Sequence, residues 1–283
     1  MITLVVFSMD RAMQCESLLR SLRDHATGID RTVVIARATS RLHQESYVSL
    51  QAEHPECRVV NDVRGCSVHL AQVLADGVDH VSLAVDDQLF YRSSDFRQAA
   101  QALDNEKGFV WSWRLGEKPG TTTVGDGAFW WCSPLVSDSD YSYLFHSDGA
   151  VFHAREYTAL LDRFLPDWRS SALIPNNLEG HVAACYLQWC ATVGPHLGPL
   201  KPTCITWQVN KESTTRAYGA PWVTTLGTEL DVLAEAFLAG WRVDNQALYA
   251  DLSWVTRFQR PGDHPMHITA CAEASQFYAT MIR

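Results

Sequence analysis

Two carboxylates stand side by side, at Asp86 and Asp87, directly after the short apolar run of residues 80–85 (HVSLAV). A buried strand that stops on two acidic residues presents them at its carboxyl end, where open α/β sheets bind their ligands. Two hard oxygen donors suit Mg²⁺ or Mn²⁺, and such a cation suits a diphosphate. The pair therefore predicts a metal site that supports a diphosphate leaving group, although Asp is also common in solvated turns.

The charge of the chain narrows the classes of ligand. The 283 residues carry a formal net charge of -9, whereas a surface that binds nucleic acid is basic. An acidic protein that binds a polyanionic diphosphate needs a cation or local positive groups, which favours the metal. Because 47% of the residues are hydrophobic and 19% are charged, the chain can bury a core and is not intrinsically disordered.

Cysteine usage and the start of the chain indicate the compartment. The 8 cysteines form no Cys-x-x-Cys pair, so the motifs of zinc and thiol redox sites are missing. The first residues, Met1 to Leu4, lack the basic segment and cleavage signal of a secretory peptide. No apolar run is long enough to span a bilayer. We therefore expect a cytoplasmic protein without a membrane span.

Strand and helix patterns alternate through the first part of the chain. Continuous apolar runs predict strands, and apolar residues at i, i+3, i+4 and i+7 predict a helix. We expect strands at 2–7, 32–36, 58–60 and 81–85, a first helix with Cys15, Leu18, Leu19 and Leu22 on one face, and a helix capped by Ser67 that ends before Gly77. This alternation predicts an α/β fold with a mostly parallel central sheet flanked by helices.

The second part of the chain is aromatic and less regular. We expect strands at 109–113, 128–131, 150–153 and 203–209, a surface loop at 116–123, and helices at 156–164, 178–191 and 230–238.

The segment Ser8-Met9-Asp10-Arg11 ends the first strand and opens the first helix. Its polar groups would lie beside a helix N-terminus, which favours anions. Asp10 could accept hydrogen bonds from a base or ribose and Arg11 could pair with a phosphate, while Ser8 or Asp10 could instead cap the helix. The sequence contains no Gly-x-Gly-x-x-Gly run after this strand and no Gly-x-x-x-x-Gly-Lys-Ser/Thr loop, which argues against Rossmann dinucleotide and P-loop sites.

These motifs resemble those of the GT-A glycosyltransferases, near the bacterial family 2 type. The resemblance is carried by residues 6–14 (VFSMDRAMQ), residues 18–22 (LLRSL) and Val85-Asp86-Asp87; it covers the first third of the chain well and the rest loosely. Enzymes of this family bind a nucleotide-sugar with the first and third strands and hold a metal with an Asp-x-Asp or x-Asp-Asp motif.

The resemblance implies roles for these residues. Asp87 would be the direct ligand of Mn²⁺ or Mg²⁺, and Asp86 would be a further metal ligand or face the ribose. Ser8, Asp10 and Arg11 would bind the nucleotide. The fold would be a single GT-A (Rossmann-like) domain, with a nucleotide-sugar-binding half at 1–107, an acceptor-side half with a smaller sheet at 108–215, and a C-terminal helical tail at 216–283.

Two acidic residues match positions near the acceptor in this family. Asp148, in His146-Ser147-Asp148-Gly149, matches a segment at the acceptor site, and Glu179, in residues 176–181 (NNLEGH), matches the acidic residue that starts a late helix. The family's usual Glu-Asp is Glu-Gly here. A general base must lie within hydrogen-bond reach of the attacking hydroxyl. A plain turn at Asp148, and a helix start where Glu179 complements the dipole, are equally compatible with these residues.

Tryptophans in two expected strands could stack on the C–H faces of a sugar. Trp111 and Trp113 would share one strand face, whereas Trp130 and Trp131 would lie on opposite faces. Aromatic residues also dominate protein cores, so each of these tryptophans has a structural alternative.

We therefore expect a metal-dependent glycosyltransferase of the hexosyltransferase class, which transfers a sugar from a nucleotide-diphosphate sugar to a hydroxyl of a sugar or small molecule. A sugar-phosphate nucleotidyltransferase is one alternative, but such enzymes usually carry a Gly-rich, basic loop after the first strand. Residues 8–14 contain no glycine, and Arg11 is their one cation. A non-catalytic nucleotide-sugar-binding module is the other alternative.

Overall fold

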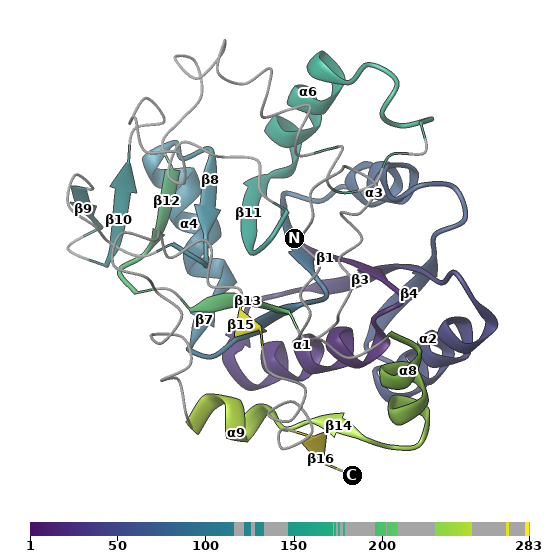
Figure 1. Ribbon diagram of the computed structural model, residues 1–283. Helices are drawn as coiled ribbons and strands as arrows, with labels where there is room; N and C mark the ends of the chain where they lie inside the picture. Colours follow the sequence, from purple (N-terminus) through teal and green to yellow (C-terminus); the bar gives the residue numbers. More distant parts are fainter. Residues whose placement is uncertain are drawn as a thin grey trace.

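A computed structural model of the chain describes residues 1–115, 122–125, 128–132, 147–171, 173, 175, 178, 196–201, 203–208, 230–250, 270–271 and 281–282. Within these residues, nine strands form one large sheet in the order β4-β3-β1-β5-β11-β8-β12-β10-β9 (Figure 1). No helix in these ranges combines the length and the apolar character that a bilayer crossing requires.

Four parallel strands make up one half of the large sheet. They are β1 (Ile2–Met9), β3 (Arg31–Arg37), β4 (Cys57–Asn61) and β5 (His80–Val85). β1 lies between β3 and β5 and runs parallel to both. Because all four strands run in one direction, the residues that follow them meet at one edge of the sheet. The predicted strands at the start of the chain are therefore confirmed, each within two residues of its expected ends.

The other half of the sheet reverses direction at β11 (Ala150–His153), which runs antiparallel to β5 and to β8. The remaining strands of this half are β8 (Val110–Ser112), β12 (His196–Pro199), β10 (Phe129–Cys132) and β9 (Thr122–Val124). A separate three-stranded sheet is formed by β15 (Ala270–Cys271), β13 (Cys204–Gln208) and β6 (Gln88–Phe90). The expected α/β fold with a smaller second sheet is confirmed.

Two further strand pairs are short. β2 (Ala26–Thr27) pairs in parallel with β7 (Ser94–Asp95). β14 (Arg242–Val243) pairs antiparallel with β16 (Met281–Ile282).

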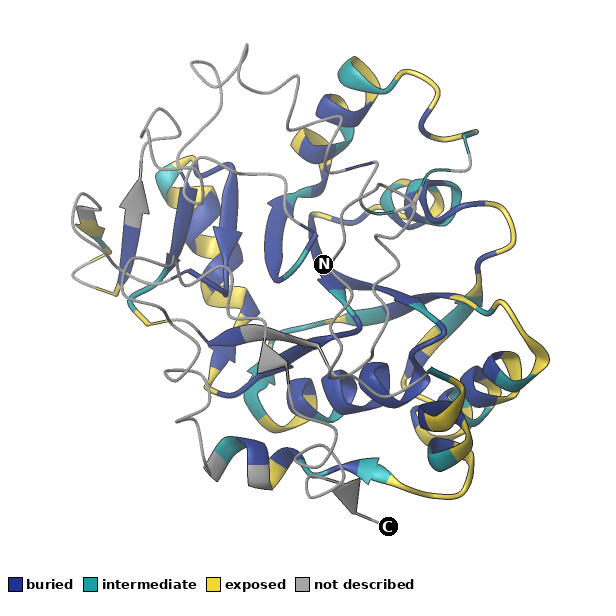
Figure 2. Cartoon of the chain, in the orientation of Figure 1, coloured by how far each residue is buried: buried dark blue, intermediate teal, exposed yellow. Residues whose placement is uncertain are grey.

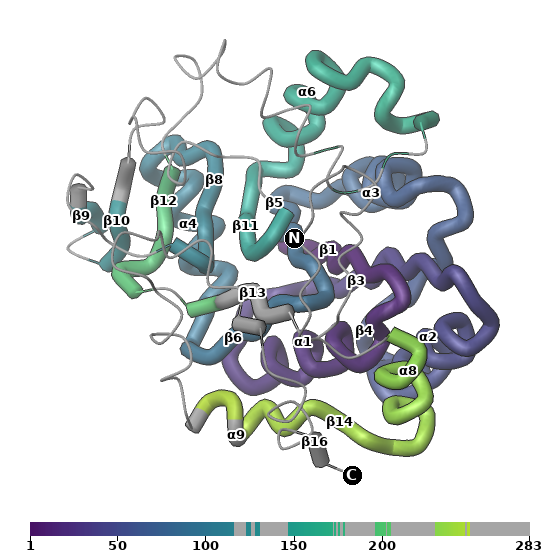
Figure 3. The backbone as a smooth tube through the Cα atoms, in the orientation of Figure 1, coloured from purple at the N-terminus to yellow at the C-terminus, as the bar shows by residue number. Residues whose placement is uncertain are grey.

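Helices cover both faces of the parallel half, as Figure 3 shows. One face is covered by α1 (Ala12–His25), α2 (Arg41–Glu53) and α4 (Phe96–Glu106). α8 (Leu230–Leu238) contacts α1 and α2, and α9 (Asn245–Ala250) contacts α1. The other face packs against α3 (Cys66–Ala75) and α6 (Ala154–Phe164). Alternation along β1 supplies both cores, because Leu4 and Val6 point to the first layer while Val5 and Phe7 point to the second.

The aromatic strands fill the core and do not form a sugar platform. Trp111 and Trp113 are buried and pack against each other, with ring centroids 5.3 Å apart. Phe96 of α4 covers Trp113 at 4.9 Å. Trp130 is also buried and donates from its indole Nε1 to the Leu115 carbonyl at 3.3 Å. The hypothesis that these three tryptophans stack on a sugar is therefore wrong. Figure 2 shows β8, the strand that carries Trp111, in the dark blue of buried residues. The side chain of Trp131 lies outside the described part of the chain.

Several local expectations need correction. α3 begins after Gly65, not after a cap at Ser67, whose hydroxyl donates instead to the Ser171 carbonyl at 2.6 Å. The expected loop at 116–123 contains the start of β9. Helices α2 and α4 occupy segments for which no helix was expected. The predicted helix at 178–191 lies almost entirely outside the described residues.

The α2 helix offers a matched test of the packing. Leu50 is fully buried in the same hydrophobic cluster as residues of α1 and β1, whereas Val48 on the same helix is 67% exposed. We expect Leu50→Ala to lower the free energy of unfolding by about 2–5 kcal/mol, because it leaves a cavity in the core. Val48→Ala should change it by less than about 0.5 kcal/mol. Urea unfolding monitored by circular dichroism measures both, and equal effects would contradict this packing.

Candidate functional site

The acidic pair lies where β1 and β5 end side by side. Phe7 on β1 pairs with Val85 on β5, and the backbone N–H of Asp86 donates to the Phe7 carbonyl at 3.0 Å. Ser8 lies near the end of β1 and Asp86 directly follows β5, so these two polar residues face each other at the carboxyl edge of the sheet. The structure therefore brings together the first strand's Ser8 to Arg11 segment and the acidic pair, as expected from the sequence.

Three donors hold the buried carboxylate of Asp86. Its Oδ2 accepts from the Ser8 hydroxyl at 2.9 Å and from the backbone N–H of Met9 at 3.1 Å. Its Oδ1 accepts from Nη1 of Arg11 at 3.1 Å. Ser8 is held in turn by the Tyr47 hydroxyl of α2, 2.5 Å away. Asp86 is therefore a fixed part of the scaffold that joins β1, β5 and α2.

Arg11 bridges the two acidic side chains. The same Nη1 atom donates to Oδ2 of Asp87 at 3.0 Å. All three side chains are buried, with exposed fractions of 8% for Arg11, 5% for Asp86 and 9% for Asp87. We call these residues the Arg11 triad. It contains two carboxylates and one guanidinium, so its formal charge is negative when both carboxyls are ionised.

The N-terminus of α1 lies at this triad. Arg11 is its N-cap residue, and no side chain of the described residues caps the helix. The alternative in which Ser8 or Asp10 caps α1 is therefore wrong, because Ser8 bonds Asp86 and Asp10 bonds Thr39. The uncapped N–H groups and the positive end of the helix dipole face a site that favours anions.

Asp10 joins β1 to the end of β3. Its φ of 58° places it in the left-handed region, which a non-glycine residue adopts rarely. Its Oδ1 accepts from the backbone N–H of Thr39 and its Oδ2 from the Thr39 hydroxyl, both at 2.7 Å. A carboxylate offers roughly four lone-pair positions, so Asp10 keeps acceptor capacity for a further donor.

Burial and charge shape the protonation of the triad. Burial raises the pKa of Asp86 to about 6, and the negative charge of Asp87 adds to that effect while Arg11 opposes it. Burial likewise raises the pKa of Asp87, against the pull of Arg11 and Arg114. For Arg11, burial lowers the pKa, but attraction by Asp86 and Asp87 outweighs it and the net pKa is raised. The guanidinium stays charged at every relevant pH.

Asp148 approaches the triad through Arg114. The two side chains form a close ion pair, and both are largely buried, with exposed fractions of 9% for Arg114 and 23% for Asp148. Arg114 acts electrostatically on Asp87, so it connects Asp148 to the acidic pair. Ser147 to Gly149 form a bend before β11, and Gly149, with φ of 73°, lies against the side chains of Gln88 and Arg114. Glu179, the other candidate base, lies outside the described residues.

A pocket of about 450 Å³ opens at the same edge of the sheet, beyond β3 and β4. It is lined by Arg37, Ala38, Gln44, Asn61, Asp62, Val63, Arg64 and Gly65. In the turn of residues 62–65, Oδ1 of Asp62 accepts a hydrogen bond from the backbone N–H of Gly65 at 2.7 Å. The Arg37 carbonyl accepts the Asp10 N–H at 3.0 Å, which ties this pocket to the triad. Arg37 and Arg64 were not among the predicted site residues, although both follow expected strands of the parallel half and so belong at this edge.

The donor set of the triad fits a hard cation. Asp86 already accepts three hydrogen bonds, whereas Asp87 accepts a bond from Nη1 of Arg11 through its Oδ2 atom. Asp87 therefore has more capacity left for a metal than Asp86. Mg²⁺ and related ions are commonly bound through one or two carboxylates, with phosphate oxygens and water completing the shell. The residues present fit that type of site.

No protein-family model matches the chain, and no curated protein matches it. Several solved structures are similar in fold. TarS of S. aureus in complex with UDP is 14% identical with a TM-score of 0.42, and the match covers 70% of this chain and 60% of that chain. The mannosyltransferase PcManGT of Pyrobaculum calidifontis, in complex with GDP-Man and Mn²⁺, is 17% identical with a TM-score of 0.38, covering 57% and 46%.

A synthase of another class is similar to a comparable degree. The 4-diphosphocytidyl-2C-methyl-D-erythritol synthase of Anaerococcus prevotii is 11% identical with a TM-score of 0.38, and the match covers 66% of this chain and 96% of that chain. The neighbours thus include GT-A-type glycosyltransferases and a nucleotidyltransferase. The chain spans less than two thirds of TarS and of PcManGT.

The triad makes a prediction about stability. Arg11→Met leaves two buried carboxylates without their cation, so we expect the free energy of unfolding at pH 8 to fall by about 3–5 kcal/mol. Asp87→Asn leaves one guanidinium facing one carboxylate, so its stability should equal or exceed that of the original protein. Chemical unfolding of both variants measures the difference.

Arg41 provides the control for this prediction. Its side chain is 91% exposed and pairs with Glu45 on the surface of α2. Arg41→Met should change stability by less than about 1 kcal/mol. If Arg11→Met has the same free energy of unfolding as Arg41→Met, Arg11 does not stabilise the two buried carboxylates.

Proposed function

We propose that this protein is a metal-dependent glycosyltransferase of the hexosyltransferase class, which transfers a sugar from a nucleoside-diphosphate sugar to a hydroxyl group of a sugar or small molecule. The proposal rests above all on one observation: two adjacent buried carboxylates and an arginine gather at the carboxyl ends of parallel strands, beside an uncapped helix N-terminus. A site with these charges suits a divalent cation together with a diphosphate.

The nucleoside is assigned to the pocket beyond β3 and β4. Arg37 and Arg64 supply positive charge there, and Asn61 supplies amide hydrogen bonds. Asp10 lies between this pocket and the triad, where its remaining acceptor capacity suits the hydroxyls of a ribose. The nucleotide would then extend from the nucleobase to the diphosphate along the carboxyl ends of β3, β1 and β5. Ser8 supports this path by fixing Asp86.

The diphosphate is assigned to the triad and the start of α1. Asp87 would hold Mn²⁺ or Mg²⁺, with Asp86 as its neighbour, and Arg11 and the first N–H groups of α1 would face the phosphate oxygens. When bound, the cation would neutralise charge on the departing nucleoside diphosphate. Arg114 acts electrostatically on Asp87 and is assigned to the same oxygens.

Deprotonation of the acceptor hydroxyl is assigned to a carboxylate on the acceptor side, either Glu179 or Asp148. A base there would lead to inversion at the anomeric carbon, because the hydroxyl attacks opposite the leaving diphosphate. Asp148 is already paired with Arg114, so its availability as a base depends on breaking or sharing that contact. Glu179 is the matching position in the GT-A glycosyltransferases that the sequence resembles.

Metal-dependent nucleotide binding is the first test. We expect UDP, GDP or TDP to raise the melting temperature when Mn²⁺ is present and to lose this effect in EDTA, since a ligand that binds the native state stabilises it. Asp87→Asn should remove the Mn²⁺-dependent part of the shift. The shift should also weaken as the pH falls through about 6, because Asp86, whose pKa is raised to about 6, becomes protonated and no longer attracts a cation.

Asp167→Asn is the matched control, because Asp167 is an exposed carboxylate on the turn after α6. It should respond to nucleotide and Mn²⁺ as the original protein does. A nucleotide response that is equally large in EDTA, or that survives in Asp87→Asn, would contradict the assigned metal site.

The catalytic base is tested by turnover. Release of nucleoside diphosphate from UDP-, GDP- and TDP-hexoses is measured with a panel of hydroxyl acceptors, and nucleoside triphosphates with sugar 1-phosphates serve as the competing reaction. Removing the base, by Glu179→Gln or Asp148→Asn, should lower kcat by about a hundredfold to ten-thousandfold while nucleotide-induced stabilisation remains. Pyrophosphate release from the competing substrates would instead identify a nucleotidyltransferase, and unchanged turnover in both variants would refute the base assignment.

A further inference from the structure

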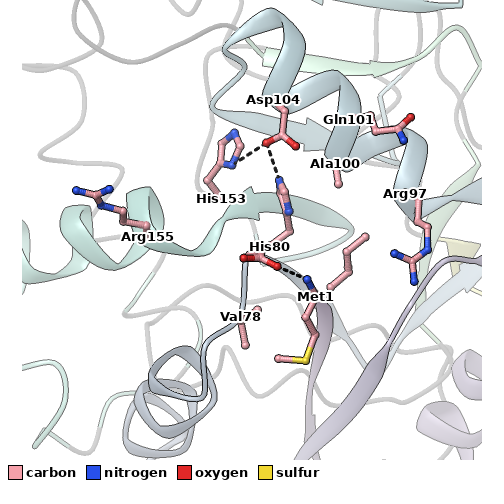
Figure 4. Close-up of a pocket in the computed structure, with 11 residues that line it drawn as sticks. Met1, Val78, His80, Arg97, Ala100, Gln101, Asp104, His153 and Arg155 are labelled. Atoms are coloured by element: carbon pink, nitrogen blue, oxygen red, sulfur yellow. Dashed lines mark hydrogen bonds and ion pairs between the residues drawn. The ribbon is translucent and has the colours of Figure 1, made fainter.

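A second group of potential metal ligands lies at the opposite end of β5. His80 is the first residue of β5 and His153 is the last residue of β11, and the two are direct partners across the antiparallel pair. Asp104, in the last turns of α4, lies over both rings (Figure 4). Since β5 is six residues long and rises about 3.3 Å per residue, this group lies roughly 20 Å from Asp86 and belongs to a different site.

The spacing of the three side chains matches a shared centre. Oδ1 of Asp104 lies 3.3 Å from Nε2 of His80 and 3.6 Å from Nδ1 of His153. One ligand atom from each residue can be chosen so that all three lie within 4.8 Å of one another. For Zn²⁺ bound at about 2.0–2.1 Å, two ligand atoms of a tetrahedron are about 3.4 Å apart. The two separations measured from Asp104, 3.3 and 3.6 Å, are close to that value.

Hydrogen bonding alone does not account for this arrangement. The separation of 3.6 Å is too long for a hydrogen bond, and Nε2 of His80 is buried and makes no hydrogen bond within the described part of the chain. The side chain of His80 is 9% exposed, and its Nε2 atom faces Oδ1 of Asp104 at 3.3 Å. The His153 ring packs against that of His80 with centroids 4.7 Å apart.

We propose that His80, Asp104 and His153 bind one transition-metal ion of the Zn²⁺ type, with a fourth coordination position open to the adjoining cavity. Two imidazole nitrogens and one carboxylate oxygen are a donor set that Zn²⁺ accepts, usually with water as the fourth ligand. Binding replaces water around the ion with these three side chains and requires no change in oxidation state.

The cavity supports an open position. Its volume is about 520 Å³, and Met1, Asp79, Arg97, Gln101 and Arg155 line it together with the three ligands. The negative charge of Asp79 pairs with the amino terminus of Met1, and Arg97 pairs with Asp30 at 2.5 Å. The metal would be bound by one side chain from each of α4, β5 and β11. It would thereby stabilise the junction between the parallel and antiparallel halves of the large sheet.

The experiment titrates Zn²⁺ into the Asp87→Asn protein, which keeps this site and lacks the proposed metal ligand of the triad. Isothermal titration calorimetry gives the stoichiometry, and Co²⁺ substitution gives the visible absorption of a tetrahedral site. We expect one tightly bound ion and a higher melting temperature. Asp104→Asn and His153→Gln, added separately, should each weaken binding by more than about tenfold.

Glu106→Gln on the same helix is the control and should bind Zn²⁺ as the parent does. Asp104 is 55% exposed, so its substitution tests the site without disturbing the core, and circular dichroism confirms the fold of each variant. Absence of Zn²⁺ binding to the parent, or unchanged affinity in both Asp104→Asn and His153→Gln, would overturn the proposal. Neither result bears on the triad, because nucleotide binding is measured separately.

Discussion

The buried ion cluster of Arg11, Asp86 and Asp87 is the constraint on which the site depends. Removing one carboxylate from water costs several kcal/mol, and two adjacent ones repel each other as well. Arg11 offsets this cost with a single Nη1 atom that contacts both, while Ser8 and the Met9 N–H satisfy Asp86. The cluster therefore holds β1, β5 and α1 together through charge, at the place where the sheet would otherwise expose its ends.

The same cluster has one more negative than positive charge when both carboxyls are ionised. One guanidinium faces two carboxylates, and burial raises the pKa of both acids. A second cation at this place would relieve the repulsion and lower those pKa values, so the folded protein is electrostatically prepared for one. In the proposed function, the positive charge of the metal would offset the negative charge of the phosphates and of the two carboxylates. Stability and ligand affinity are therefore opposed at Asp87, as is common in functional sites.

The parallel half of the fold and most of its edge residues were predictable, because apolar runs mark the strands and parallel strands end at one edge. The ion pair between Arg11 and both acidic residues could not be predicted from the sequence, because it depends on the left-handed turn at Asp10. Helix α4 was missed although Phe96, Ala99, Ala100 and Leu103 show helical spacing and Asp95 caps it. In α2, buried His43 and Ser46 interrupt the apolar stripe and hide the helix.

The histidine group shows a different limit of sequence patterns. His80, Asp104 and His153 are far apart in the chain, and they meet because β11 runs antiparallel to β5 and places His153 opposite His80. No local pattern encodes that reversal. If both proposed sites bind metal, each would select a different ion, because carboxylates and phosphates favour Mg²⁺ or Mn²⁺ whereas imidazole favours Zn²⁺. A single strand, β5, would then connect a hard-ion site at one end to a softer one at the other.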